Sequence, residues 1–253
     1  MNDTTDHTLS KVPEVTLIFW IIKIAATTLG ETGGDAVSMS MNLGYLVSTA
    51  IFAAIFLIAV LAQIRAKCFH PFLYWTTIIA TTTVGTTLAD FADRSLGIGY
   101  AGGSALLFAL LVSSLAVWYR SLGSVSVDTV STPKVEMFYW ITIMFSQTLG
   151  TALGDWTADT AGLGYGGGAV VFSILLGVVV AAYFWTSISR TVLFWAAFIL
   201  TRPLGAVVGD FLDKPSDAGG LALDRFSASA VLLAIMVACI LIVPQRAGKT
   251  AAH

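Results

Sequence analysis

Charged side chains are scarce in this sequence. Of its 253 residues, 11% are Asp, Glu, Lys or Arg, whereas 57% are hydrophobic. A soluble domain carries about a quarter charged residues. A single soluble core could not bury so much apolar surface, so the composition indicates a membrane protein. The net charge of -2 gives no excess of basic groups for binding nucleic acid, and no nucleic-acid partner is expected.

Cysteine and histidine are rare as well. Cys68 and Cys239 lie far apart in the chain, and His7, His70 and His253 lie near the termini or in an expected loop. Neither residue type has the spacing of a metal site. The apolar segments also contain no Ser-His, Cys-His or zinc-ligand set. We therefore expect no enzyme and no resident cofactor.

One pattern occurs four times along the chain. Each copy begins with an aromatic residue and Trp, has Gly ten residues after the Trp, and has Asp fifteen residues after it. The residue before that Asp is Gly or Ala, and the first three copies have Tyr 25 residues after the Trp. The repeated Trp residues are Trp20, Trp75, Trp140 and Trp195. The repeated Asp residues are Asp35, Asp90, Asp155 and Asp210. A fixed period of this kind indicates a tandem-repeat architecture.

Each copy contains two apolar runs, and a membrane-spanning helix needs roughly 20 residues. The sequence therefore predicts an all-α polytopic membrane protein with eight transmembrane helices. The expected spans are 14–36, 44–65, 72–93, 101–120, 136–158, 165–187, 191–212 and 226–244. The expected repeats are 12–67, 68–123, 133–188 and 189–246, with tails at 1–11 and 247–253 and a linker at 124–132.

Lys and Arg are distributed unevenly between the expected loops. The termini and the loops after even-numbered spans contain most of them, whereas the loops after odd-numbered spans contain only Arg94, Lys214 and Arg225. Basic residues favour the cytoplasmic side, so we expect both termini in the cytoplasm and the protein in a bacterial inner (plasma) membrane. An even number of spans per copy makes the repeats parallel, related by an axis normal to the membrane. We expect a pseudo-fourfold or two-plus-two bundle.

A polar stripe runs along each odd-numbered span. Positions 7, 11 and 15 after each Trp fall on one helical face. In chain order, the residues at these positions are Thr27, Glu31 and Asp35, then Thr82, Thr86 and Asp90, then Gln147, Thr151 and Asp155, then Arg202, Ala206 and Asp210. Lys23 extends the first stripe by one turn. Because an ionised side chain costs at least a few kcal/mol inside a membrane, we expect the stripes to face a shared centre.

These stripes suggest a cation pathway. Glu31 and the four repeated Asp residues outnumber the two basic residues Lys23 and Arg202, so a bound cation or protons must balance the excess. The candidate metal ligands are Glu31, Asp35, Asp90, Asp155 and Asp210. Thr27, Thr82, Gln147 and Thr151 would line the route with neutral oxygens. Ligands that are all oxygen suit Mn²⁺, Mg²⁺, Ca²⁺ or Na⁺.

Other interpretations stay open. Each repeated Asp could accept hydrogen bonds from the first turn of the following span, as a structural clamp in a non-transporting scaffold. Lys23 and Arg202 could instead hold a small organic anion, or Lys23 could extend to the membrane surface. The repeated Trp residues are typical of an interfacial aromatic belt. The further acidic residues Asp93, Asp159 and Asp213 are expected at solvated helix ends.

The four copies, with an aromatic-Trp pair and a later Gly-Asp in each, resemble a bacterial family of four-repeat membrane-anchored proteins of unknown function. The resemblance covers residues 12–246 and is weaker in the second half of the last copy, where Tyr is missing. It implies the architecture and no chemistry. The segment "GETGGD" at 30–35 is similar to the Glu-X-Gly-Asp signature of small calcium/manganese-proton exchangers, although Glu31 and Asp35 are one residue further apart.

The sequence therefore predicts a membrane transporter or exporter of a small hard cation, with protons as a candidate coupling ion. The expected partners are the lipid bilayer and the small ion, and the pattern is compatible with a homo-oligomer. A carrier of an organic anion and a scaffold are the two alternatives.

Overall fold

Eight α-helices make up the fold in a computed structural model that describes residues 10–248. They are α1 (Leu17–Asp35), α2 (Gly44–Arg65), α3 (Pro71–Asp90), α4 (Tyr100–Leu122), α5 (Pro133–Asp155), α6 (Gly164–Trp185), α7 (Arg190–Asp213) and α8 (Arg225–Ile242). The predicted all-α fold of eight helices from four repeats is confirmed, and most ends lie within a few residues of the predicted ones.

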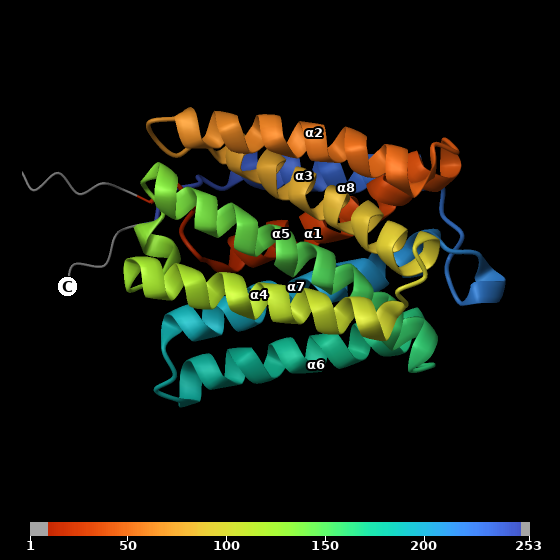
Figure 1. The fold of residues 1–253 in the computed structure, drawn as a ribbon. Helices are drawn as coiled ribbons and strands as arrows, with labels where there is room; N and C mark the ends of the chain where they lie inside the picture. Colours follow the sequence, from red (N-terminus) through yellow and green to blue (C-terminus); the bar gives the residue numbers. More distant parts are fainter. Residues whose placement is uncertain (1–9, 249–253) are drawn as a thin grey trace, which may run out of the picture.

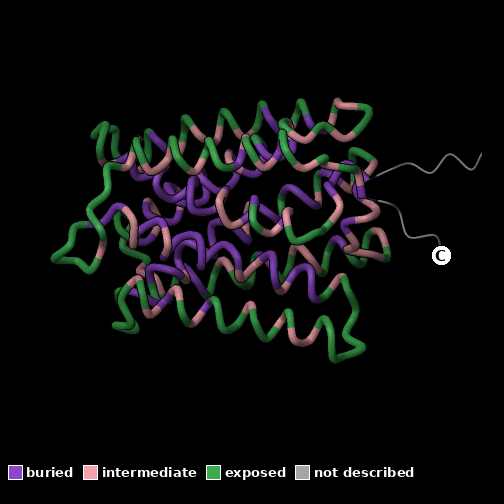
Figure 2. The backbone as a smooth tube through the Cα atoms, turned by 180° about the vertical axis from the view of Figure 1, so that it is seen from behind, coloured by how far each residue is buried: buried purple, intermediate pink, exposed green. Residues whose placement is uncertain are grey.

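The helices form two layers (Figure 1). The inner layer is a closed ring in which α1 contacts α3, α3 contacts α5, α5 contacts α7, and α7 contacts α1. The outer layer consists of α2, α4, α6 and α8. Figure 2 shows the buried residues gathered in the inner layer and the exposed residues along the outer helices. Polar stripes thus lie inside, behind a covering of apolar helices.

Five helices are long and apolar enough to cross a membrane: α2, α4, α6, α7 and α8. The exposed side chains of the outer helices are largely Leu, Ile, Val and Phe, which suits contact with lipid rather than water. The other three inner helices, α1, α3 and α5, are less apolar because of their polar stripes. They lie beside α7 in the same ring and are shielded from lipid by the outer layer.

Each outer helix packs on the inner helix of the next repeat rather than on its own. Helix α2 packs on α3, α4 on α5, α6 on α7, and α8 returns to α1. The two helices of one repeat therefore make few contacts with each other. The last repeat closes the ring by covering the first.

The repeated glycines explain how the inner ring closes. The side chain seven residues after Trp on one inner helix occupies the space above the repeated Gly on the neighbouring one. An added Cβ at Gly30 would lie 2.2 Å from Thr82 Cγ2, and one at Gly150 would lie 2.1 Å from Arg202 Cγ. The same contact joins Gly85 to Gln147 and Gly205 to Thr27. These glycines begin small-xxx-small motifs, which allow close approach of membrane helices.

The ring of inner helices is filled with aromatic side chains at the end where the chain termini lie, here called the aromatic end. Phe19, Tyr74, Tyr139 and Phe194 are at most 6% exposed. The hydroxyls of Tyr74 and Tyr139 are 2.6 Å apart and share a hydrogen bond. The prediction that the repeated Trp residues form an interfacial belt is wrong for three of them, since Trp75, Trp140 and Trp195 are also buried.

The segment predicted as a linker helps to cover the aromatic end. It contains the 3-10 turn η3 (Val127–Thr129). Ser10 Oγ donates to the Val127 carbonyl at 2.7 Å, and the Lys11 backbone N–H donates to the Val130 carbonyl. The Lys11 ammonium is buried and pairs with Glu136 Oε1 at 2.5 Å. The N-terminal segment is thereby fixed across the bundle instead of being a free tail from residue 10 onward.

The opposite end of the ring, here called the aspartate end, differs in the fourth repeat. Helices α1, α3 and α5 each end at the repeated Asp and continue into a π-helical turn: η1 (Ala36–Ser40), η2 (Phe91–Ser95) and η4 (Trp156–Thr160). Helix α7 instead continues past Asp210 to Asp213. A loop with the 3-10 turn η5 (Ser216–Ala218) then leads to α8. This loop accounts for the extra residues that interrupt the repeat pattern.

Candidate cation site at the aspartate end

The polar stripes of the four inner helices face the centre of the ring. Thr27, Thr82, Gln147, Thr151 and Arg202 are 0% exposed. Close packing at the glycines brings side chains of neighbouring helices into contact along the axis. The structure therefore brings together the residues that the sequence proposed for a pathway, and it leaves them densely packed.

Arg202 is the centre of the deeper polar layer. Its Nη2 donates to Glu31 Oε2 at 3.0 Å and to Thr86 Oγ1 at 2.6 Å, and also to the Thr151 hydroxyl. One guanidinium thus connects α7 with α1, α3 and α5. Its Nε and Nη1 have no hydrogen-bond partner within residues 10–248.

Lys23 lies nearer the aromatic end and is 0% exposed. Its Nζ donates to Gln147 Oε1 at 3.3 Å and lies 4.1 Å from the centre of the Phe198 ring. The alternative that Lys23 extends to the membrane surface is therefore wrong. Its ammonium faces the centre of the bundle, as the Arg202 side chain does from α7.

Basic residues from the loops at the aspartate end neutralise the repeated carboxylates. Arg94 Nε lies 2.9 Å from Asp90 Oδ1, and Arg94 Nη2 lies 3.4 Å from Asp155 Oδ2. Lys214 pairs with Asp35 and lies 3.0 Å from Asp210 Oδ1. All four repeated carboxylates therefore have a basic neighbour from the turn or loop that follows α3 or α7.

A third base, Arg225, extends this network at the start of α8. Its Nε lies 3.0 Å from Asp213 Oδ2, and its Nη2 lies 3.8 Å from Asp35 Oδ2. The structure describes no hydrogen bond from the backbone at the start of an outer helix to any of the four repeated Asp residues. The clamp alternative in that form does not describe the geometry, because basic side chains occupy the carboxylates instead.

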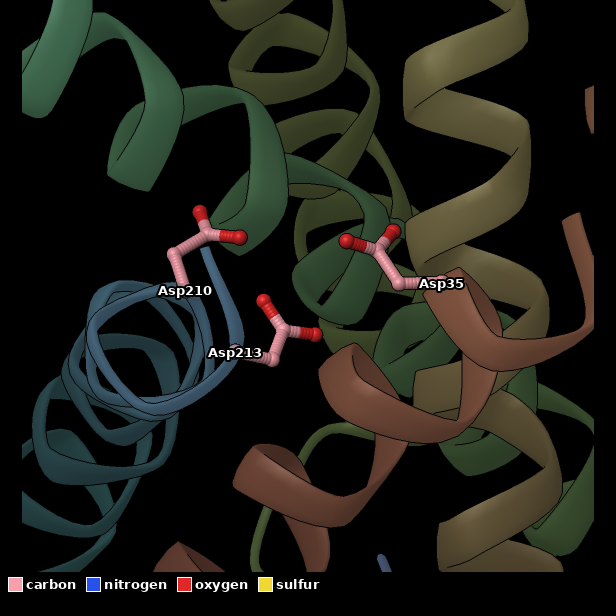
Figure 3. A group of neighbouring side chains, drawn as sticks. All are labelled: Asp35, Asp210 and Asp213. Carbon is pink, nitrogen blue, oxygen red and sulfur yellow. The ribbon is translucent and has the colours of Figure 1, made fainter. Parts of the chain in front are cut away.

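Three carboxylates converge between α7 and the end of α1. Asp35, Asp210 and Asp213 each offer an oxygen, and these oxygens lie within 4.8 Å of one another. Figure 3 shows the three carboxyl groups around the space that separates the two helices. Each residue is buried and has one oxygen, Oδ1, without a hydrogen-bond partner among the described residues. For Asp210, the 3.0 Å contact with Lys214 is an ion pair that lacks hydrogen-bond geometry.

Asp213 and Asp93 were wrongly expected at solvated helix ends. Asp213 is 6% exposed and Asp93 is 7% exposed, whereas Asp159 is on the surface as expected. A signal in the sequence could have found the first two, because both lie eighteen residues after the Trp of their repeat. At that position only the second and fourth copies have Asp.

The aspartate end carries an excess of negative charge. Six buried carboxylates lie there: Asp35, Asp90, Asp93, Asp155, Asp210 and Asp213. Three bases oppose them: Arg94, Lys214 and Arg225. The formal charges therefore leave an excess of three negative charges at this end, to be balanced by protons or a cation. The count made from the sequence omitted these three bases because they lie in loops.

Lys214 remains positively charged in this environment. Burial alone would lower the pKa of its ammonium, but the carboxylates of Asp210, Asp35 and Asp213 raise this pKa above its usual value. The ammonium therefore stays protonated at neutral pH. It fills part of the space that a small cation would occupy among the three carboxylates.

The fold and this site define a class: a multi-pass helical membrane protein of four tandem repeats, with ionisable residues enclosed by its inner helices. Comparison with protein-family models places the chain within that class. A family described as "Repeat of Unknown Function (DUF347)" matches residues 18–68, 73–124, 138–189 and 193–244. The chain belongs to this family, and the resemblance seen in its sequence is confirmed. Comparisons with curated proteins and with solved structures gave no match.

Proposed function

We propose that this protein is a membrane carrier for a small hard cation, which binds among Asp35, Asp210 and Asp213. One observation carries this proposal: three buried carboxylates from two inner helices place oxygens within 4.8 Å of one another. Each of them retains an oxygen without a hydrogen-bond partner in the described part of the chain. Buried carboxylates in a membrane protein are typical of ion or proton pathways.

The chemistry of the site favours a hard divalent ion or Na⁺. Carboxylate oxygens are the ligands that Ca²⁺, Mg²⁺ and Mn²⁺ prefer. The excess negative charge at the aspartate end supports binding of a cation, and protons on the remaining carboxylates would balance what the ion does not. Asp90 and Asp155 lie in the same layer and would contribute to the field that attracts the cation.

The next acidic group toward the centre is Glu31, one helical turn from Asp35 on α1. A cation that leaves the aspartate site inward would meet Glu31, with Thr86 and Thr151 as neutral oxygens beside it. Arg202 lies in this same layer, and Lys23 and the aromatic side chains lie beyond it, so the ring is closed by packed side chains within residues 10–248. The proposed carrier therefore works by separation of inner helices rather than as a channel. We assign the aspartate end to the outer face of a bacterial inner membrane, with cytoplasmic termini.

A second function, transport of a small organic anion, is favoured by one observation. Arg202 Nε and Nη1 are buried without acceptors in residues 10–248, and Lys23 adds a second cation nearby. An anion would be held by these donors, with Glu31 and the Asp residues handling protons. Arg202→Ala would then abolish substrate affinity, whereas Asp213→Asn would leave it unchanged.

The cation proposal is tested by measuring metal-dependent thermal stability of the purified protein with Mn²⁺, Mg²⁺, Ca²⁺ and Na⁺ separately. We expect at least one ion to raise the melting temperature of the wild type, and Asp213→Asn to remove that increase. Asp217→Asn is the matched control, because Asp217 is exposed in the same loop. Flux of the stabilising ion into proteoliposomes should follow the same order. If no ion shifts the wild-type transition, or if both variants behave alike, the cation proposal is wrong.

A further inference from the structure

The basic residues at the aspartate end reveal a twofold relation between the two halves of the chain. Arg94 and Lys214 occupy the same position, nineteen residues after Trp75 and Trp195. The corresponding residues of the first and third repeats are Met39 and Asp159. A base at this position thus occurs in the second and fourth repeats only.

The two bases make equivalent contacts. Arg94 pairs with Asp90, four residues earlier on its own repeat, and with Asp155 of the next inner helix. Lys214 pairs with Asp210, also four residues earlier, and with Asp35 of the next inner helix. Asp93 and Asp213 precede the two bases directly. The aspartate end therefore contains two related ion clusters, the Arg94 cluster (Asp90, Asp93, Arg94, Asp155) and the Lys214 cluster (Asp35, Asp210, Asp213, Lys214).

The two clusters differ in the base that holds them. A guanidinium is planar, remains charged and offers several fixed donors, whereas a Lys ammonium is a compact point charge on a flexible stem. Arg94 makes two separate nitrogen contacts to Asp90 and Asp155. The single Nζ of Lys214 makes both contacts of its cluster. The Lys214 cluster brings three carboxylate oxygens within 4.8 Å of one another, and residues 10–248 contain no second group of this kind.

The backbone of Lys214 is fixed by the loop that follows α7, and its side chain is slightly exposed. The loop after α7 folds back, so that the Ala222 N–H donates to the Lys214 carbonyl at 2.9 Å. Gly220 packs directly on that carbonyl, where a Cβ would lie 2.1 Å from the oxygen. The Lys214 side chain is 11% exposed. Rotation about the bonds of the Lys214 side chain would carry the ammonium out of the cluster without movement of the helix.

We propose that Lys214 is a built-in competitor for the cation: its ammonium occupies the Asp35, Asp210 and Asp213 site when that site is empty, and leaves when a cation binds. The Arg94 cluster does not bind a cation in this way, because the Arg94 guanidinium stays on its carboxylates. This inference rests on the proposed function and adds its regulation. Exchange of one ammonium for a divalent cation adds one positive charge among carboxylates that are in excess, so the exchange is electrostatically favourable.

Binding of Mn²⁺, measured by its electron paramagnetic resonance signal and by equilibrium dialysis, tests this inference. We expect Lys214→Gln to bind Mn²⁺ at least about ten-fold more tightly than the wild type, because no tethered ammonium competes. Lys214→Arg should bind at least about ten-fold more weakly, since a guanidinium would close the site as Arg94 closes its own. Lys134→Gln is the control for removal of a positive charge, since Lys134 is exposed at the other end of the bundle.

A second variant opens the counterpart cluster. Arg94→Lys should raise the number of Mn²⁺ ions bound per protein from one to two, which a change in folding would not do. Thermal unfolding without metal establishes that each variant is folded. If the wild type binds Mn²⁺ but Lys214→Gln and Lys214→Arg bind it with unchanged affinity, the competitor inference is wrong and the cation proposal stands. If neither the wild type nor Lys214→Gln binds Mn²⁺ or any of the other three ions, both are wrong.

Discussion

Glu31→Gln is the substitution whose effect on folding follows most directly from the deeper polar layer. Glu31 is 2% exposed, and its carboxylate accepts a hydrogen bond from Arg202, which is 0% exposed. The variant keeps the shape and one acceptor oxygen but removes the only acidic partner that Arg202 has within residues 10–248. A guanidinium then remains enclosed by four helices, with the buried Lys23 ammonium as a second positive charge inside the ring.

The expected cost is that of a buried charge without its counterion. Removal of one partner from a buried ion pair typically costs about 3–5 kcal/mol. The Gln amide oxygen still accepts from Arg202, so we expect a loss near the lower end, about 3 kcal/mol. For a chain of this size each kcal/mol corresponds to roughly 2–4 °C in the melting temperature. The variant should therefore melt on the order of 10 °C below the wild type.

Thermal unfolding in detergent, followed by circular dichroism, measures this difference. The double variant Glu31→Gln with Arg202→Gln removes both charges and should be more stable than Glu31→Gln alone, because no isolated charge remains. Asp217→Asn removes an exposed acid and serves as the control. The reasoning is refuted if Glu31→Gln melts within about 2 °C of the wild type. It is also refuted if Arg202→Gln lowers the stability of the Glu31→Gln variant by as much as it lowers that of the wild type.

Three further predictions concern other parts of the fold. Gly150→Ala places a Cβ 2.1 Å from a side chain of α7 and should cost about 1–3 kcal/mol in thermal unfolding, whereas Gly177→Ala, with nothing within 4 Å, should be neutral or stabilising; equal effects would contradict close packing at the repeated glycines. Tyr74→Phe leaves the buried Tyr139 hydroxyl without its partner and should cost about 1–3 kcal/mol, and a double Phe variant should recover much of that loss, unless the hydroxyl pair has no structural role. Hydrogen bonds from the first turn of α8 lower the pKa of Asp224, so this group stabilises the fold above its unfolded pKa of about 3.9 and loses that effect as the pH falls through its folded pKa. Asp224→Ala should then melt below the wild type at pH 7, and the gap should narrow as the pH falls through the folded pKa of Asp224; a gap independent of pH would contradict this role.

Periodicity in the sequence was sufficient to predict the helices and their number. The four copies of the pattern of Trp, Gly and Asp located the inner helices, and the apolar runs between these copies located the outer helices. The pairing of helices could not be predicted, because each outer helix is apolar on most sides and carries no feature that distinguishes its own repeat from the next. The repeated Gly allows close contact between helices, but the sequence does not identify the side chain that packs against it. Only the folded ring shows that partner.

The candidate site was predictable in part. The inward stripes follow from helical periodicity and from the cost of charge in a membrane, which placed Glu31 and Asp35 on the same face. Arg94 and Lys214 were assigned to loops because their position after the repeated Asp falls at the predicted membrane surface. A helix end that turns back over the bundle brings such residues inward, and neither composition nor hydropathy registers that turn. Comparison of the repeats with one another would have found the base shared by the second and fourth copies.

The packing of each outer helix on its successor has a consequence for assembly in the membrane. During synthesis no repeat can acquire its covering until the following one has been inserted, and α1 waits for α8, the last of the eight described helices. Insertion from the N-terminus therefore leaves an unsealed edge until the chain is complete. Two copies of a two-repeat half could close the same circle with each other, so a chain of half this length, working in pairs, would be a structurally sufficient ancestor.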